Sequence, residues 1–119
     1  GQFDISHPGN WGWTAMIMQP DHITDSMFDE GLAKLRNKRP SPALDGLRFG
    51  VFHEGLSMQI MHIGPYGDEP ATLARMEEFA RQNSYILCGK HHEIYLGDPR
   101  RSAPEKLRTI LRHPIQASR

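Results

Sequence analysis

The sequence predicts an α+β domain in which two amphipathic helices cover one face of an antiparallel sheet. Residues 47–53 and 56–63 alternate apolar and polar side chains, and Glu54-Gly55 between them has the composition of a tight hairpin turn. Two other segments, near 24–39 and 68–83, instead carry apolar residues at helical spacing. Two such helices need one sheet face to cover, which leaves the other face to line a groove.

The first part of the chain predicts an arm, a strand and a helix. Residues 1–11 are polar and turn-rich and predict an irregular arm, and residues 12–19 predict a strand. Thr24 is a suitable N-cap for a helix that buries Phe28, Leu32 and Leu35. The basic residues at 34–39 suit the negative end of the helix dipole.

The second helix is predicted to open at residues 68–70 and to end at Asn83. Its buried stripe would be Leu73, Met76, Phe79 and Ala80.

Residues 91–96 then predict a strand, but periodicity leaves two alternatives for residues 103–113. Ser102 and Glu105 have the spacing of a capping box, which would begin a helix through Leu111. Residues 108–113 also alternate as an edge strand, which Pro114 would stop. Residues 116–119 predict a tail.

Composition excludes several classes of protein. The 119 residues carry 14 basic and 14 acidic side chains, so the chain lacks the positive surface expected of a nucleic-acid-binding protein. No apolar run is long enough to span a membrane. A single cysteine, Cys88, excludes an internal disulfide, fits a reducing cytoplasm and argues against a zinc site built on it, because no second cysteine is present.

The strand at 91–96 carries the sharpest candidate site. Alternation places His91, Glu93 and Tyr95 on one face, and His92, Ile94 and Leu96 on the other. We expect Ile94 and Leu96 to pack beneath the helices and Glu93 and Tyr95 to project into the groove. A carboxylate, a phenol and an imidazole on one apolar strand are typical of a pocket for a small polarised or cationic ligand.

Aromatic and sulfur-containing side chains are the other candidates for lining a ligand pocket. Aromatic rings stack on flat ligands or hold cations over their faces, and methionines form an adaptable lining, although ordinary core packing explains either pattern as well. The residues concerned are Trp11, Trp13, Met16, Met18, Met61, His62 and Tyr66. Adjacent histidines on a strand point to opposite faces and no H-x-H or HExxH spacing occurs, so we predict no metal site and no cofactor.

Three stretches resemble the GyrI-like small-molecule-binding family. They are Met16–Asp21, Met61–Pro70 with its H-x-G-x-Y pattern, and His91–Arg101 with its E-I-Y-x-x-D-P pattern, continuing to Pro104–Leu107. The resemblance implies a tandem of two β-helix-β-β units with a ligand in the groove between them. Residues 12–115 would then be the second unit preceded by the last strand of a first unit that is absent here, and residues 107–113 would be the last strand.

The resemblance is closest to the branch of cyclopropanoid hydrolases, which open the strained ring of DNA-alkylating compounds. It implies that Glu93 activates a water molecule and that Tyr95 or Tyr66 stabilises charge on the ligand. A sensor without turnover and an interaction protein like a gyrase inhibitor are the alternatives. The ligand would be an aromatic or cationic small molecule, and the chain would be a homodimer or would need a missing N-terminal half.

Overall fold

The computed structural model describes residues 12–119, which form two compact units, Gly12–His53 and Glu54–Arg119. Each unit is described by itself. The arm expected at residues 1–11, including Trp11, lies outside the described residues.

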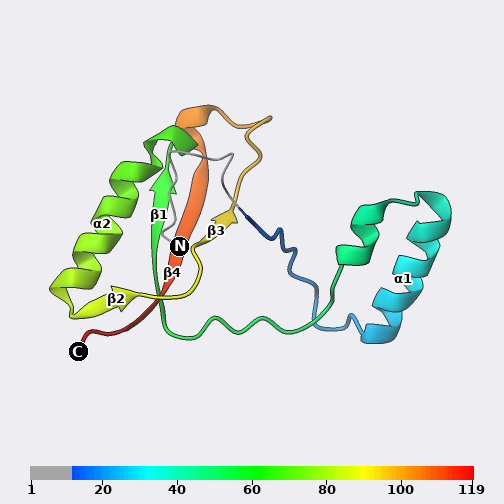
Figure 1. Cartoon of the computed structure of the whole chain (residues 1–119). Helices are drawn as coiled ribbons and strands as arrows, with labels where there is room; N and C mark the ends of the chain where they lie inside the picture. Colours follow the sequence, from blue (N-terminus) through cyan, green and yellow to red (C-terminus); the bar gives the residue numbers. More distant parts are fainter. Residues whose placement is uncertain (1–11) are drawn as a thin grey trace. The chain divides into compact units, whose positions relative to one another are not determined.

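The unit Glu54–Arg119 is an antiparallel sheet organised around one long strand (Figure 1). The central strand β4 (Arg108–Ala117) pairs on one edge with all of β1 (Ser57–Ile63). Its other edge pairs with β3 (His92–Tyr95) and, farther along, with β2 (Tyr85–Leu87). The predicted α+β class with an antiparallel sheet is confirmed.

Helix α2 (Glu69–Gln82) covers one face of this sheet (Figure 1). Pro70 stands in its first turn and the Asn83 N–H closes its C-terminus, so the predicted bounds are confirmed. Phe79 is 52% exposed, which corrects its predicted place in the buried stripe. The core between helix and sheet consists of Met58, Met76, Ala80, Leu111 and Ile115, with Leu73 packed against it.

Of the helix and the strand predicted as alternatives for residues 103–113, the structure contains the strand. Residues 104–106 form only a short 3-10 turn, η4 (Pro104–Lys106), before β4 begins. Pro114 does not stop β4, because it lies between the stretches of β4 that pair with β3 and with β2. There its missing N–H breaks no ladder bond, while its carbonyl still accepts from the Cys88 N–H at 2.9 Å. The strand therefore continues to Ala117, two residues into the expected tail.

The predicted hairpin is wrong. Within residues 12–119, no strand forms at 47–53, and β1 takes its whole register from β4 instead. Gly55 does adopt the expected positive φ, +79°. A ten-residue central strand offers β1 a complete ladder, which the local turn signal did not reveal.

The unit Gly12–His53 holds helix α1 (Asp25–Lys38) and the short 3-10 turn η2 (Pro42–Gly46). Thr24 caps α1 as predicted, its hydroxyl accepting from the Met27 N–H at 3.2 Å. Phe28 of the predicted stripe stacks on Phe49. No residue of α1 is buried, however, which corrects the predicted burial of that stripe. Residues 12–19, expected as a strand, form none in this unit.

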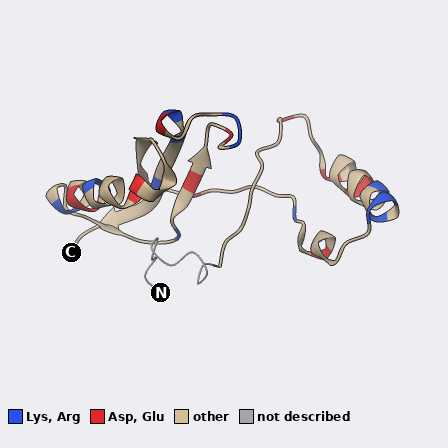
Figure 2. Ribbon diagram, turned by 90° about the horizontal axis from the view of Figure 1, so that it is seen from above, with Lys and Arg blue, Asp and Glu red and all other residues tan. Residues whose placement is uncertain are grey.

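Acidic and basic residues occur together on both helices (Figure 2). Among the described residues, no helix is long and apolar enough to cross a membrane.

Candidate functional site

Strand β3 presents Glu93 and Tyr95 on the face of the sheet that α2 covers. Glu93 pairs with Leu111 and Tyr95 with Thr109, and paired residues of an antiparallel ladder share a face. Leu111 is fully buried in the core beneath α2. This register agrees with the prediction that Glu93 and Tyr95 share one face.

Ile94 and Leu96 do not pack beneath the helix. Ile94 pairs with Ile110, whose side chain points away from Leu111 on the same strand. Leu96 lies on that opposite face as well and is 53% exposed. The prediction was wrong because α2 covers the polar side of β3, where its N-terminus brings a further carboxyl against Glu93.

That further carboxyl belongs to Glu69, the first residue of α2. Glu69 is only 2% exposed, and the Glu93 side chain is 11% exposed. The two carboxyls are hydrogen-bonded to each other, which requires a proton between them because two carboxylates have no donor. Sequence reasoning missed Glu69, since an acid in the first turn of a helix is ordinarily a solvated partner of the helix dipole.

The two carboxyls have opposite pKa shifts. Burial and the bond to Glu93 raise the pKa of Glu69 to about 8. Burial also acts to raise the pKa of Glu93, but hydrogen bonds from His91 and Glu69 outweigh it, and the pKa is lowered. At neutral pH the proton therefore resides on Glu69, and Glu93 is a carboxylate.

Two phenols lie next to the pair. The rings of Tyr66 and Tyr95 meet edge to face with centroids 5.8 Å apart, and they are 37% and 60% exposed. Burial, together with the charges of Glu93 and Glu69, raises the pKa of Tyr95 to about 12. Tyr66 has its pKa raised by burial, Glu69 and Glu93. Both side chains are hydrogen-bond donors at neutral pH.

The two predicted histidines differ in their surroundings. The Nε2 of His91 lies 3.4 Å from Glu93 Oε2, and the His91 side chain is 5% exposed. His62 is buried, with Nδ1 2.7 Å from the Thr72 hydroxyl and Nε2 2.9 Å from the Pro65 carbonyl. Because both ring nitrogens of His62 are already bonded within the protein, we assign it to holding β1 against α2 rather than to ligand binding.

A polar cluster supports β3 from its other face. The Glu54 carboxylate lies 3.0 Å from Nδ1 of His92 and 3.6 Å from the Arg112 guanidinium, which also donates to Gln59. His92 and Arg112 are paired across the ladder. Glu54 thereby ties the residue next to Glu93 to the central strand. Sequence reasoning missed this cluster, because Glu54 lies 38 positions from His92 and no local pattern links them.

The remaining predicted ligand residues lie elsewhere. Trp13, Met16 and Met18 belong to the unit Gly12–His53, where each is more than half exposed. Met61 is opposite Ile110 in the ladder, on the face away from α2, and is 42% exposed.

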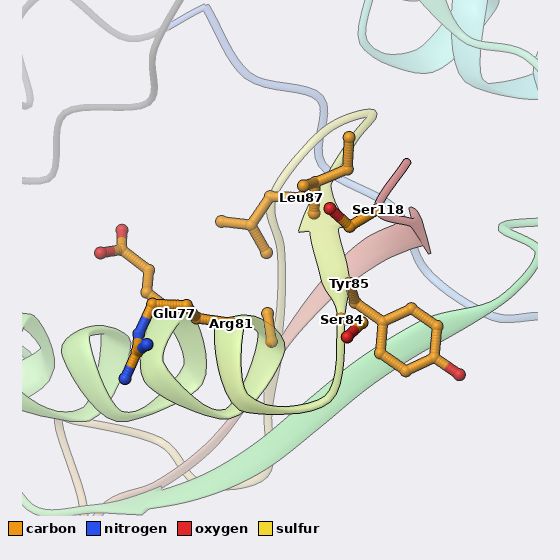
Figure 3. Close-up of a pocket in the computed structure, with 8 residues that line it drawn as sticks. Glu77, Arg81, Ser84, Tyr85, Leu87 and Ser118 are labelled. Atoms are coloured by element: carbon orange, nitrogen blue, oxygen red, sulfur yellow. The ribbon is translucent and has the colours of Figure 1, made fainter.

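Two open hollows lie away from the carboxyl pair. One is at the C-terminal end of α2, whereas Glu69 begins that helix (Figure 3). Its lining is Glu77, Ala80, Arg81, Ser84, Tyr85, Ile86, Leu87 and Ser118. The other is an apolar hollow beside α1 in the unit Gly12–His53. Neither contains a predicted catalytic residue.

Within residues 12–119, no group of three or more His, Cys, Asp or Glu side chains could hold a metal ion.

The family model of the GyrI-like small molecule binding domain matches residues 15–116. The chain belongs to this family. This match confirms the predicted resemblance. Domains of the GyrI-like family bind small molecules.

Two solved structures from Listeria innocua are similar to this GyrI-like chain. A hydrolase has a TM-score of 0.72 and 35% identity, covering 82% of this chain and 52% of its own. An uncharacterized conserved protein has a TM-score of 0.75 and 37% identity, covering 82% of this chain and 50% of its own. The chain thus spans about half the length of these structures. Comparison with curated proteins gives no match.

Proposed function

We propose that this GyrI-like chain binds a small electrophilic molecule and hydrolyses it with Glu93 as the base. The observation that carries the proposal is the buried pair of Glu69 and Glu93, in which one carboxyl holds a proton and the other does not. Two carboxyls with divergent pKa values are the usual arrangement for an acid and a base acting together. The similar hydrolase from Listeria innocua supports the same reaction class.

The proposed substrate is a cyclopropane conjugated to a carbonyl group, as in DNA-alkylating cyclopropanoids. The water oxygen forms a bond to the ring carbon while the strained carbon–carbon bond breaks. The electron pair of the broken carbon–carbon bond moves to the carbonyl oxygen, which takes up a proton. Glu93 takes the proton that the water loses. Tyr66 and Tyr95 remain protonated at neutral pH and can donate to the developing oxyanion. The biological result would be detoxification.

A time course with a spirocyclopropane dienone tests this function. We expect the wild-type chain to convert it to the ring-opened alcohol, and Glu93→Gln to reduce the rate at least 100-fold, because the amide keeps the shape but cannot accept the proton. Glu105→Gln, at an exposed position, is the matched control and should retain full activity. Undiminished turnover in Glu93→Gln would reject the role of Glu93.

A second candidate function is ligand binding without turnover. The ionised Glu93 beside the partly exposed Tyr95 and Tyr66 also suits a cationic aromatic ligand. Saturable binding of such a ligand by a wild-type chain that produces no alcohol would favour this function, as in a sensor domain.

A further inference from the structure

Within the described part of the chain, residues 12–119, two buried oxygen atoms at the carboxyl pair have no hydrogen-bond partner. They are the Thr109 hydroxyl and the Oε1 atom of Glu69. Thr109 is 0% exposed and Glu69 is 2% exposed. A buried polar oxygen left unpaired is costly, and native proteins pair nearly all such atoms with protein groups or with ordered water. These two oxygens therefore require a partner that residues 12–119 do not supply.

The ladder places Thr109 within the candidate site. On β4, Thr109 stands directly between His62 of β1 and Tyr95 of β3. It shares the α2 face with Leu111, and Leu111 is opposite Glu93. His62 cannot satisfy the Thr109 hydroxyl, because its two ring nitrogens are bonded to Thr72 and Pro65. Glu69 reaches the same region through its bond to Glu93.

We propose that Thr109 and Glu69 together bind one water molecule beside Glu93. A buried water needs two to four polar partners. The threonine hydroxyl can donate to the water oxygen, and Glu69 Oε1 can accept one water hydrogen while the other Glu69 oxygen carries the proton shared with Glu93. The second water hydrogen then serves Glu93, and one lone pair of the water remains directed at a ligand.

This site deepens the proposed function, and its catalytic part rests on that function. The bound water is the nucleophile, and Glu93 takes its proton as the oxygen attacks the electrophilic carbon. Thr109 acts as a positioning residue, because its hydroxyl orients the water and does not touch the reacting carbon. Binding of the water itself does not depend on any turnover.

The variants Thr109→Val and Thr109→Ser test the proposal. Valine has the shape of threonine without the hydroxyl, and serine keeps the hydroxyl. High-resolution crystal structures should show one ordered water within hydrogen-bond distance of Oγ and of Glu69 Oε1 in the wild type and in Thr109→Ser, and none there in Thr109→Val. A wild-type site without water, together with a higher melting temperature of Thr109→Val, would overturn the proposal.

Kinetics give a second readout that a purely structural role would not produce. Thr109→Val should lower kcat roughly 10- to 100-fold with little change in KM, because the nucleophile is misplaced while the ligand still binds. Thr109→Ser should recover most of the loss, and Thr14→Val, at an exposed position, should change nothing. An unchanged kcat in a folded Thr109→Val would overturn the catalytic part. If the wild type hydrolyses nothing, the proposed function fails, whereas the crystal structures still decide whether the water binds.

Discussion

At the scale of single residues, one proton shared by Glu69 and Glu93 sets the charge of the site. With that proton the pair carries one negative charge, and without it two. Because the pKa of Glu69 is about 8, the change falls slightly above neutral pH. A ligand that needs a carboxylate base and a nearby acid therefore meets both at pH 7, and only the base well above pH 8.

The pH dependence of stability should report this proton. Unfolding returns the pKa of Glu69 from about 8 to its ordinary value of 4.5, so the folded state binds more protons than the unfolded state between these values. The Glu69 contribution is therefore fully present below pH 4.5 and is lost as pH rises towards 8. Glu69→Gln removes this titration, and its melting temperature should fall less than that of the wild type from pH 5 to pH 8. Parallel pH profiles of the two proteins would contradict the raised pKa.

His62 provides a prediction about packing. Replacing it with alanine removes two hydrogen bonds, leaves the Thr72 hydroxyl and the Pro65 carbonyl without their partner and opens a cavity. We expect His62→Ala to lower the free energy of unfolding by about 2–4 kcal/mol. Urea denaturation measures it, and a loss below about 0.5 kcal/mol would show that these bonds contribute little.

At the scale of elements, the connection between β2 and β3 lies close to Pro114 at Gly89. Gly89 has φ +62°, and a Cβ there would stand 3.1 Å from Pro114 Cγ. We expect Gly89→Ala to destabilise the chain by about 1–3 kcal/mol, since alanine is strained at positive φ and would also crowd the ring. Gly67→Ala is the control, because no atom lies within 4 Å of its Cβ position. Equal melting temperatures of the two variants would contradict the close approach at Gly89.

Local signals predicted the helices better than the sheet. Thr24, Pro70 and Asn83 each lie within one turn of a helix end, so local sequence was enough to predict where the helices begin or end. Pairing between β1 and β4 joins residues about 50 positions apart, which alternation within either strand cannot specify. The same reason explains the site: alternation grouped His91, Glu93 and Tyr95, whereas Glu69 joins them only through the packing of α2 on the sheet.

At the scale of the whole molecule, the chain carries many exposed apolar side chains. In the unit Gly12–His53, Ile17 is 84% exposed, Met18 95% and Val51 100%. Concentrations of exposed apolar groups usually mark interfaces. We propose that a second copy covers these residues in a homodimer, because symmetric pairs are the commonest oligomers.

Sedimentation velocity tests this assembly. We expect a dimer at micromolar concentration, and the double variant Ile17→Lys, Val51→Lys should shift it towards monomer, because charged side chains oppose burial at an interface. Gln116→Lys, an exposed change outside this unit, is the control. A monodisperse wild-type monomer would contradict the dimer.

The measurement that tests the central claim most directly is a ¹³C NMR titration of the glutamate side-chain carboxyls. The account predicts that the Glu69 carboxyl titrates near pH 8, that the Glu93 carboxyl titrates below its ordinary value of 4.5, and that Glu93→Gln lowers the pKa of Glu69. Assignments from the single variants Glu69→Gln and Glu93→Gln identify the two resonances. Two carboxyls that both titrate near 4.5, each unaffected by replacing the other, would contradict the shared proton.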